Sequence, residues 1–249
     1  MVSGTSIDTA TGRVAPPEVS STRVQEIFTD IAVNYDRFNK LSSFGRYKSW
    51  LNKLIDECPI NSRTSMLDVA AGTGDVAFAA CEAKHPGTVL LTDFTPAMLD
   101  IARERLRAGE ACGVPVEIAT VDAQDIPYAS ESFDLVTMAY GIRNMPQREL
   151  ALSEIYRVLR PGGTCCILEF STPPNPIIRA LYKLYLEHGI PMWGKLTTGN
   201  RDGLVYLSKS IEAFPDQDHF SAMLYNAGFR RVSYRNCTFG VAAVYTARK

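Results

Sequence analysis

Three aspartates mark consecutive strand-like segments of this chain and could bind a nucleoside: Asp68, Asp93 and Asp122. Because the carboxyl ends of parallel strands meet at one edge of a sheet, we expect these positions to lie close together. Asp93 follows Gly74 by 19 residues, near the roughly 20-residue interval at which an acidic residue reaches ribose hydroxyls. Asp122 could accept a hydrogen bond from an adenine amine, while the backbone of Ala123 donates to the ring. Each aspartate alone could instead cap a helix or form a turn, but the set predicts an adenosine-containing cofactor.

A glycine-rich turn follows the first of these segments. It reads DVAAGTGD and spans residues 68–75. Glycines there let a ligand approach the backbone, and helix N-terminal amides face it, although such a turn can also serve only to pack a helix on its strand. Asp75 would repel a pyrophosphate, whereas the sulfonium and ammonium groups of S-adenosylmethionine would be attracted to Asp68 and Asp75. The turn therefore favours S-adenosylmethionine over a dinucleotide.

Composition excludes several other classes of protein. The 249 residues are 46% hydrophobic and 21% charged, with a formal net charge of −1, so nothing favours a nucleic-acid backbone as partner. The six cysteines never form a C-x-x-C pair, which argues against a zinc site or a disulfide framework. The adjacent Cys165 and Cys166 should point to opposite faces of a strand. No segment approaches the roughly 18 apolar residues of a membrane span, and no secretory leader is evident, so we expect a cytoplasmic protein.

Alternating strand and helix patterns position the aspartates. The expected strands cover residues 66–70, 88–93, 116–122, 133–139 and 164–170, and the helices between them cover 75–84, 96–109 and 147–159. This rhythm predicts a mostly parallel sheet with helices on both faces. Further helices are expected within 176–196 and over 217–227, before two closing strand-like runs from residue 230 that must be antiparallel because no crossover helix separates them. Such an ending favours the Rossmann-like, seven-stranded class I methyltransferase fold, of the α/β class, over a dinucleotide dehydrogenase.

The N-terminal region should be separate from the sheet. Residues 1–21 are rich in Ser, Thr, Gly and Pro and are expected to form a disordered arm. Residues 22–249 form one methyltransferase domain, in which 22–60 make a helical lid. The lid contains two apolar patterns at helical spacing, one around Ile27 and Phe28 and one around Trp50 and Leu54.

Five segments occur in an order that resembles a known family: YDRFNKLSSFGRYKSW (35–50), DVAAGTGD (68–75), AYGIRN (139–144), RVLRPGGTCCILEFS (157–171) and YLSKSIEAFPDQDHF (206–220). Together they resemble the menaquinone and ubiquinone biosynthesis C-methyltransferases over residues 24–249. The resemblance implies S-adenosylmethionine-dependent methylation of a ring carbon of a polyprenylated quinol. Demethylmenaquinol is the first expectation, and 2-methoxy-6-polyprenyl-1,4-benzoquinol, the ubiquinone precursor, is the alternative.

The resemblance also implies site residues. Thr73, Asp93, Asp122 and Ala123 would contact the cofactor. With the glycine turn and the end of the fourth strand, the expected cofactor-binding set is Asp68, Ala70, Gly72, Thr73, Gly74, Asp93, Asp122, Ala123 and Ala139. The chain departs from the family where Ala139 replaces a serine common in ubiquinone-type members, and where Phe38 and Tyr47 replace a methionine and a histidine.

The acceptor chemistry needs a group that takes a quinol proton or stabilises the phenolate, because charge pushed onto the ring makes its carbon nucleophilic. Arg143 and Asn144 follow the fourth strand and could do this, Arg143 directly or through a water, although Arg143 could equally form a surface ion pair. Tyr35 could bind the ring oxygens or merely pack in the core. His188 has a suitable pKa range, and its alternative role is a helix cap.

The apolar segment 176–196 is consistent with a lipid-tail groove or a membrane contact, although a helix that packs in the core is the more common outcome of such a pattern. The expected partner is a polyprenylated quinol, and a peripheral membrane surface and a second copy of the chain in a homodimer are further candidates; neither nucleic acid nor a metal is expected. A small-molecule O- or N-methyltransferase and a non-catalytic cofactor-binding scaffold remain alternative functions.

Overall fold

The computed structural model describes residues 25–26, 29, 43, 45–189 and 201–249. The predicted arm over 1–21 and about half of the predicted lid, including Tyr35, lie outside the described residues. Gln25, Glu26 and Thr29 are helical. The helix predicted around Trp50 and Leu54 is confirmed as α3 (Tyr47–Glu57), whose apolar side, including those two residues, is buried.

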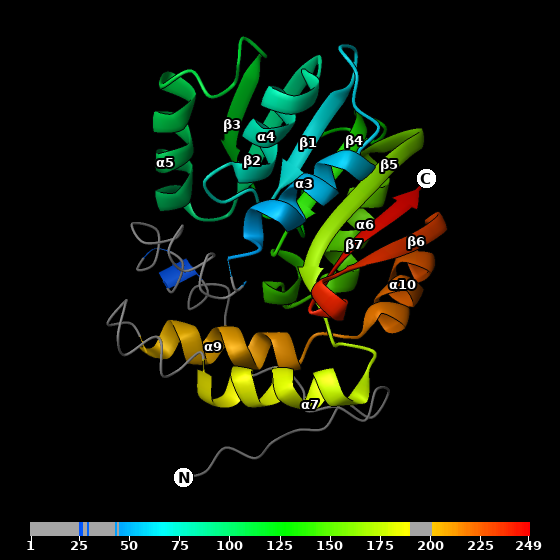
Figure 1. The fold of residues 1–249 in the computed structure, drawn as a ribbon. Coiled ribbons are helices and arrows are strands. Elements are labelled where there is room, and N and C mark those ends of the chain that lie inside the picture. The colour runs from blue at the N-terminus through cyan, green and yellow to red at the C-terminus, as the bar shows by residue number, and fades with distance from the viewer. Residues whose placement is uncertain (1–24, 27–28, 30–42, 44, 190–200) are drawn as a thin grey trace.

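The sheet is built from the predicted alternation. Its strands are β1 (Ser65–Val69), β2 (Thr88–Asp93), β3 (Val116–Thr120), β4 (Phe133–Ala139), β5 (Leu159–Phe170), β6 (Arg230–Cys237) and β7 (Ala242–Arg248). They lie in the order β3-β2-β1-β4-β5-β7-β6 (Figure 1). Strands β1 to β5 pair in parallel, whereas β7 is antiparallel to β5 and to β6. The predicted fold class and its closing antiparallel hairpin are confirmed.

Helices cover both faces of this sheet (Figure 1). They are α4 (Asp75–Lys84), α5 (Pro96–Arg107), α6 (Arg148–Val158) and α10 (Gln217–Asn226). One core layer gathers side chains of α3, α4 and α5, and the other gathers those of α6 and α10. Cys166 belongs to the first layer and Cys165 to the second, as their adjacency in a strand predicts.

Strand β5 begins earlier than its sequence suggests. Helix α6 ends at Val158, but β5 starts at Leu159 and runs through Pro161 and two glycines. The ladder with β4 has an irregularity between Phe133 and Leu135. There, the amide of Gly162 donates to the carbonyl of Lys249 at 3.0 Å instead. Lys249 also donates to the carbonyl of Gly163 at 3.0 Å, so two hydrogen bonds hold the Pro-Gly-Gly segment beside Lys249, with Gly162 at a φ of +80°.

Two helices lie across the carboxyl-terminal edge of the parallel strands (Figure 1). They are α7 (Pro176–Leu184), continued by a π-helical turn η3 (Tyr185–Gly189), and α9 (Arg201–Glu212). Asn175 caps α7 by accepting hydrogen bonds from the amides of Ile177 and Ile178. Ser208 of α9 donates to the carbonyl of Leu186 at 2.9 Å, which joins the two helices. Over the described ranges, no helix has the length and apolar character that crossing a membrane requires.

Candidate functional site

A pocket that is partly open to solvent lies at the carboxyl ends of β1 to β4. Seven predicted site residues line it: Ala70, Gly72, Asp93, Asp122, Ala123, Ala139 and Asn144. Phe94, Met98 and Val121 add apolar walls, and Gln25 reaches it from the N-terminal region. The parallel arrangement therefore brings together most of the residues that the sequence placed at successive strand ends.

Asp93 joins the end of β2 to the glycine turn. Its Oδ2 accepts a hydrogen bond from the amide of Gly72 at 2.8 Å, and its Oδ1 accepts from the amide of Thr95 at 2.7 Å. Burial raises the pKa of this carboxyl, and the backbone amides of Thr95 and Gly72 partly offset the rise. Each carboxylate oxygen has more than one lone pair, so both can still accept from the two hydroxyls of a ribose.

Asp122 lies one strand further along the same edge. Its Oδ1 accepts from the amide of Gln124 at 2.9 Å, which holds the carboxylate beside Ala123 in the cavity wall. Two carboxylates at neighbouring strand ends, separated by apolar surface, fit the ribose and the base of an adenosine.

The glycine turn approaches its neighbours too closely for larger residues. A Cβ at Gly74 would lie 2.6 Å from the Phe78 ring and 2.8 Å from Leu91, and the φ of Gly74 is +90°. The hydroxyl of Thr73 is buried and, among the described residues, has no hydrogen-bond partner. Buried polar atoms are rarely left in this state. An orphaned hydroxyl beside a close-packed turn fits a polar ligand group, although Thr73 and Gly74 do not themselves line the cavity.

The carboxylates expected to attract the cofactor's positive groups have partners within the chain. Asp68 is fully buried and accepts from the hydroxyl of Thr137 at 2.7 Å and from the amide of Ala77 at 3.1 Å. It thereby satisfies an amide in the first turn of α4. Burial raises its pKa to about 7.

Asp75 forms an ion pair with Arg105 at 2.6 Å. It also accepts from the hydroxyl of Tyr47 at 2.5 Å. Arg105 additionally donates to the carbonyl of Thr73 at 2.9 Å. Asp75 therefore helps to hold the turn in place, and Tyr47 contributes to the same network.

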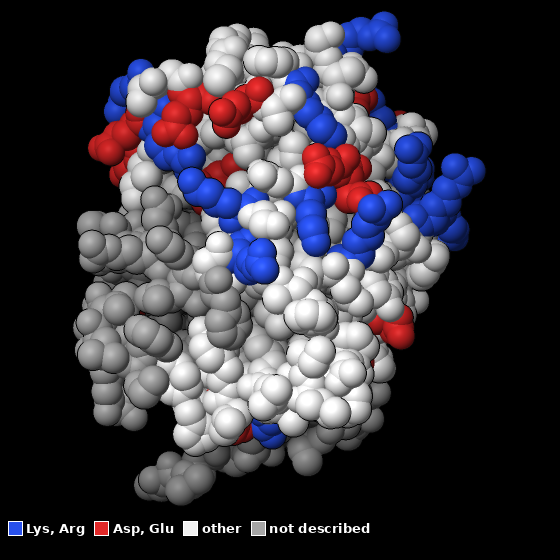
Figure 2. Space-filling view, viewed as in Figure 1, with Lys and Arg blue, Asp and Glu red and all other residues white. Residues whose placement is uncertain are grey.

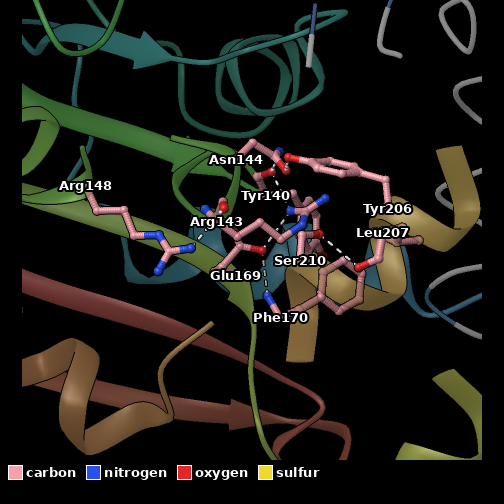
Figure 3. A network of polar contacts seen from close by, with 9 residues as sticks. All are labelled: Tyr140, Arg143, Asn144, Arg148, Glu169, Phe170, Tyr206, Leu207 and Ser210. Atoms are coloured by element: carbon pink, nitrogen blue, oxygen red, sulfur yellow. Dashed lines mark hydrogen bonds and ion pairs between the residues drawn. The ribbon is translucent and has the colours of Figure 1, made fainter. Parts of the chain in front are cut away.

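A buried polar network lies beneath the end of β4 (Figure 3). Arg143, in the short helix η2 (Ile142–Asn144), pairs with Glu169 of β5 at 2.8 Å and donates to the carbonyl of Tyr140. Glu169 also accepts from the amides of Arg143 and Phe170. Burial raises the pKa of Glu169, and Arg143 opposes the rise. Arg143 does not line the cavity, so its guanidinium acts on the chain itself.

Asn144, the next residue, does face the cavity. Its Nδ2 donates to the carbonyl of Tyr140 at 3.1 Å, and its Oδ1 accepts from the hydroxyl of Tyr206 at 3.1 Å. The sequence analysis assigned no role to Glu169 or Tyr206. A lone carboxylate within the apolar run TCCILEF could have drawn attention to Glu169, because a buried charge needs a partner.

His188 lies elsewhere. It is exposed on η3 and is not among the cavity-lining residues. In the described part of the chain, no group of His, Cys, Asp and Glu residues could hold a metal ion. The geometry supports binding of an adenosine-containing molecule in this cavity, beside the side-chain amide of Asn144.

Comparisons with known proteins agree with this geometry. A model of the ubiE/COQ5 methyltransferase family matches residues 17–249. The "Ubiquinone/menaquinone biosynthesis C-methyltransferase UbiE" of Dinoroseobacter shibae is 42% identical over 226 residues, covering 91% of this chain and 90% of that protein. The protein of the same name from Francisella tularensis subsp. novicida is 34% identical, covering 94% of each.

Solved structures show the same fold at lower identity. A SAM-dependent methyltransferase of Thermotoga maritima superposes with a TM-score of 0.63 at 21% identity, covering 90% of this chain and 99% of that one. The [4+2]-cyclase SpnF gives a TM-score of 0.68 at 16% identity, covering 95% and 99%. Because the fold carries more than one chemistry, function must be argued from the site.

Proposed function

Because this chain belongs to the ubiE/COQ5 methyltransferase family, we propose that it transfers the methyl group of S-adenosylmethionine to a ring carbon of a polyprenylated quinol. The observation that carries the proposal is the cavity itself. At one end, the carboxylate of Asp93 is held by the amide of Gly72. At the other end, Asn144 presents an amide. One cavity thus offers a nucleoside site and a polar acceptor site side by side.

The cofactor end is formed by the ends of β1, β2 and β3. Asp93 accepts from the ribose hydroxyls, and Asp122 with Ala123 binds the adenine edge. Bound S-adenosylmethionine supplies an electrophilic methyl group on a sulfonium. The small residues Ala70, Gly72 and Ala139 leave room for the methionine part of the molecule beside the backbone.

The acceptor end is formed by residues that follow β4. Asn144 can hydrogen-bond a ring oxygen of the quinol and hold the ring against the methyl group, and such positioning supplies much of the rate in a displacement. Arg148 donates to the carbonyl of Arg143 at 3.2 Å. That carbonyl directly precedes Asn144, so the hydrogen bond helps to hold the turn that carries the Asn144 side chain.

Demethylmenaquinol is the acceptor we propose first. The test is transfer of labelled methyl from S-adenosylmethionine to short-chain demethylmenaquinol and to a 2-methoxy-6-prenyl-benzoquinol, in parallel, in detergent under reducing conditions. Label on the naphthoquinol alone supports the proposal, and label on the benzoquinol supports the alternative. Label on neither, with cofactor binding shown by calorimetry, contradicts the quinol acceptor.

We also propose that α7 meets the membrane in which a polyprenyl chain would lie. Ile177, Leu181 and Leu184 are 72%, 64% and 56% exposed. Their spacing places them on one side of the helix. In Figure 2, charged side chains gather over α3 and the upper strands, whereas the area over α7 is mostly uncharged. Large exposed apolar surfaces commonly mark contact sites.

The exposed side chains of α7 provide the test of this contact. Ile178 is half-buried, so the informative variant is Ile177→Ser with Leu181→Ser. Vesicle flotation should show weaker partitioning of this variant than of the wild type. A control variant with Ser49→Ala, on the exposed side of α3, should partition normally. Equal flotation of all three folded proteins would remove the membrane contact and leave the methyl-transfer proposal standing.

A further inference from the structure

A side-chain hydrogen bond connects helix α9 to a residue that lines the cavity. Tyr206 donates its hydroxyl to Oδ1 of Asn144 at 3.1 Å. Figure 3 shows the Tyr206 side chain extending from α9 toward Asn144 at the end of β4. The two residues are 62 positions apart in the chain, so this contact exists only in the folded protein.

Two partners together fix the orientation of the Asn144 amide. The carbonyl of Tyr140 can only accept, so it takes a hydrogen of Nδ2, which donates to it at 3.1 Å. Oδ1 can only accept, so the Tyr206 hydroxyl donates to it and holds the other end of the amide. The carbonyl of Tyr140 also accepts from Arg143. Among the described residues, the amide keeps one hydrogen and one lone pair for a ligand in the cavity.

Tyr206 is itself held firmly and stays protonated. Its neighbour Leu207 and the next-turn residue Ile211 are each 2% exposed. Ser208 anchors α9 to the carbonyl of Leu186. Burial raises the pKa of Tyr206, although Arg143 and Arg148 oppose the rise. A neutral phenol on a packed helix is a dependable donor at neutral pH.

We propose that Tyr206 is a positioning residue for methyl transfer, which fixes the amide of Asn144 so that it can hold the acceptor ring. The inference rests on the proposed function, because it needs an acceptor at Asn144. In this proposal α9 orients the acceptor, and Tyr206 does not affect the cofactor site at the ends of β1 to β3.

A double-mutant cycle tests the inference, using the wild type, Tyr206→Phe, Asn144→Ala and the double variant on whichever quinol the wild type methylates. Losing one hydrogen bond should lower kcat of Tyr206→Phe about tenfold, with cofactor affinity unchanged by calorimetry. In the Asn144→Ala background, Tyr206→Phe should cause no further loss. Tyr225→Phe is the matched control, because its hydroxyl is exposed on α10 and contacts only the carbonyl of Val232, at 3.4 Å.

The pH dependence of kcat distinguishes a positioning role of Tyr206 from a purely structural one. Difluorotyrosine at position 206 has a more acidic phenol, and an ionised phenol cannot donate. The alkaline fall of kcat should therefore move to lower pH than in the wild type. Unchanged kcat in Tyr206→Phe, additive losses in the cycle or an unmoved alkaline limb would each overturn the inference while the proposed function stands. A wild type that methylates neither quinol would remove the proposed function and this inference together.

Discussion

Glu169 and Arg143 form an ion pair 2.8 Å long between side chains that are 0% and 4% exposed. The pair joins the end of β5 to the turn that follows β4, and it supports the carbonyl to which Asn144 also donates. Water solvates neither of these buried charges, so each side chain depends on the opposite charge of the other.

Replacing Glu169 by Gln should therefore lower the free energy of unfolding. The Arg143 guanidinium would keep its charge and lose its counter-charge, and breaking a buried pair in this way typically costs about 3–5 kcal/mol of unfolding free energy. Urea denaturation followed by circular dichroism measures the loss. The double variant Arg143→Met with Glu169→Leu should recover much of the stability, since it leaves no buried charge. A Glu169→Gln protein within about 1 kcal/mol of the wild type would contradict this account.

Asp93→Ala should weaken binding of S-adenosylhomocysteine, measured by calorimetry. Hydrogen bonds to a charged acceptor contribute about 1.5–3 kcal/mol each, so losing both ribose contacts should raise Kd about a hundredfold or more. Asp100→Ala is the control, because Asp100 lies on neighbouring α5 with a side chain that is 72% exposed. Equal loss of affinity in both variants would argue against a ribose contact at Asp93.

Asp68 should make stability fall as pH rises toward neutrality. Its pKa is about 7 in the folded protein against an ordinary value of 3.8, so between these values the native state binds more protons than the unfolded state. Stability then decreases with rising pH. The free energy of unfolding of Asp68→Asn relative to the wild type should therefore increase from pH 4 to pH 7 and level off above. A pH-independent difference between the two proteins would show that the raised pKa is wrong.

Gly141→Ala should disturb the cavity mainly through its closest contact, because the next neighbours, Cγ and Sδ of Met138, would lie farther away at 3.2 Å. A Cβ at position 141 would lie 2.6 Å from Cβ of Ala70, which lines the cavity. Overpacking of this kind costs about 1–3 kcal/mol, and we expect weaker cofactor binding as the turn shifts. Ala70 has a φ of +51°, which glycine adopts freely. The double variant Gly141→Ala with Ala70→Gly should thus regain affinity, and failure to do so would mean that the clash is not with Ala70.

Local pattern in the sequence determined the order of strands and helices, because period and turn residues act over a few neighbouring positions. The spacing of Asp93 and Asp122 behind the glycine turn was likewise enough to predict an adenosine site. Parallel strands bring their carboxyl ends to one edge whatever the details of packing. These predictions depended on position along the chain alone.

Only the tertiary structure decided the partner of each charge. Asp75 pairs with Arg105, which is 30 residues away in the chain. Arg143 pairs with Glu169, which is 26 residues away, and Tyr206 donates to Asn144, which is 62 residues away. From the sequence alone, Asp75 is predicted to face the cofactor and Arg143 to face the acceptor. Packing turned both toward the chain itself, because a charge that folding removes from water must find its compensation among whatever side chains the fold places beside it.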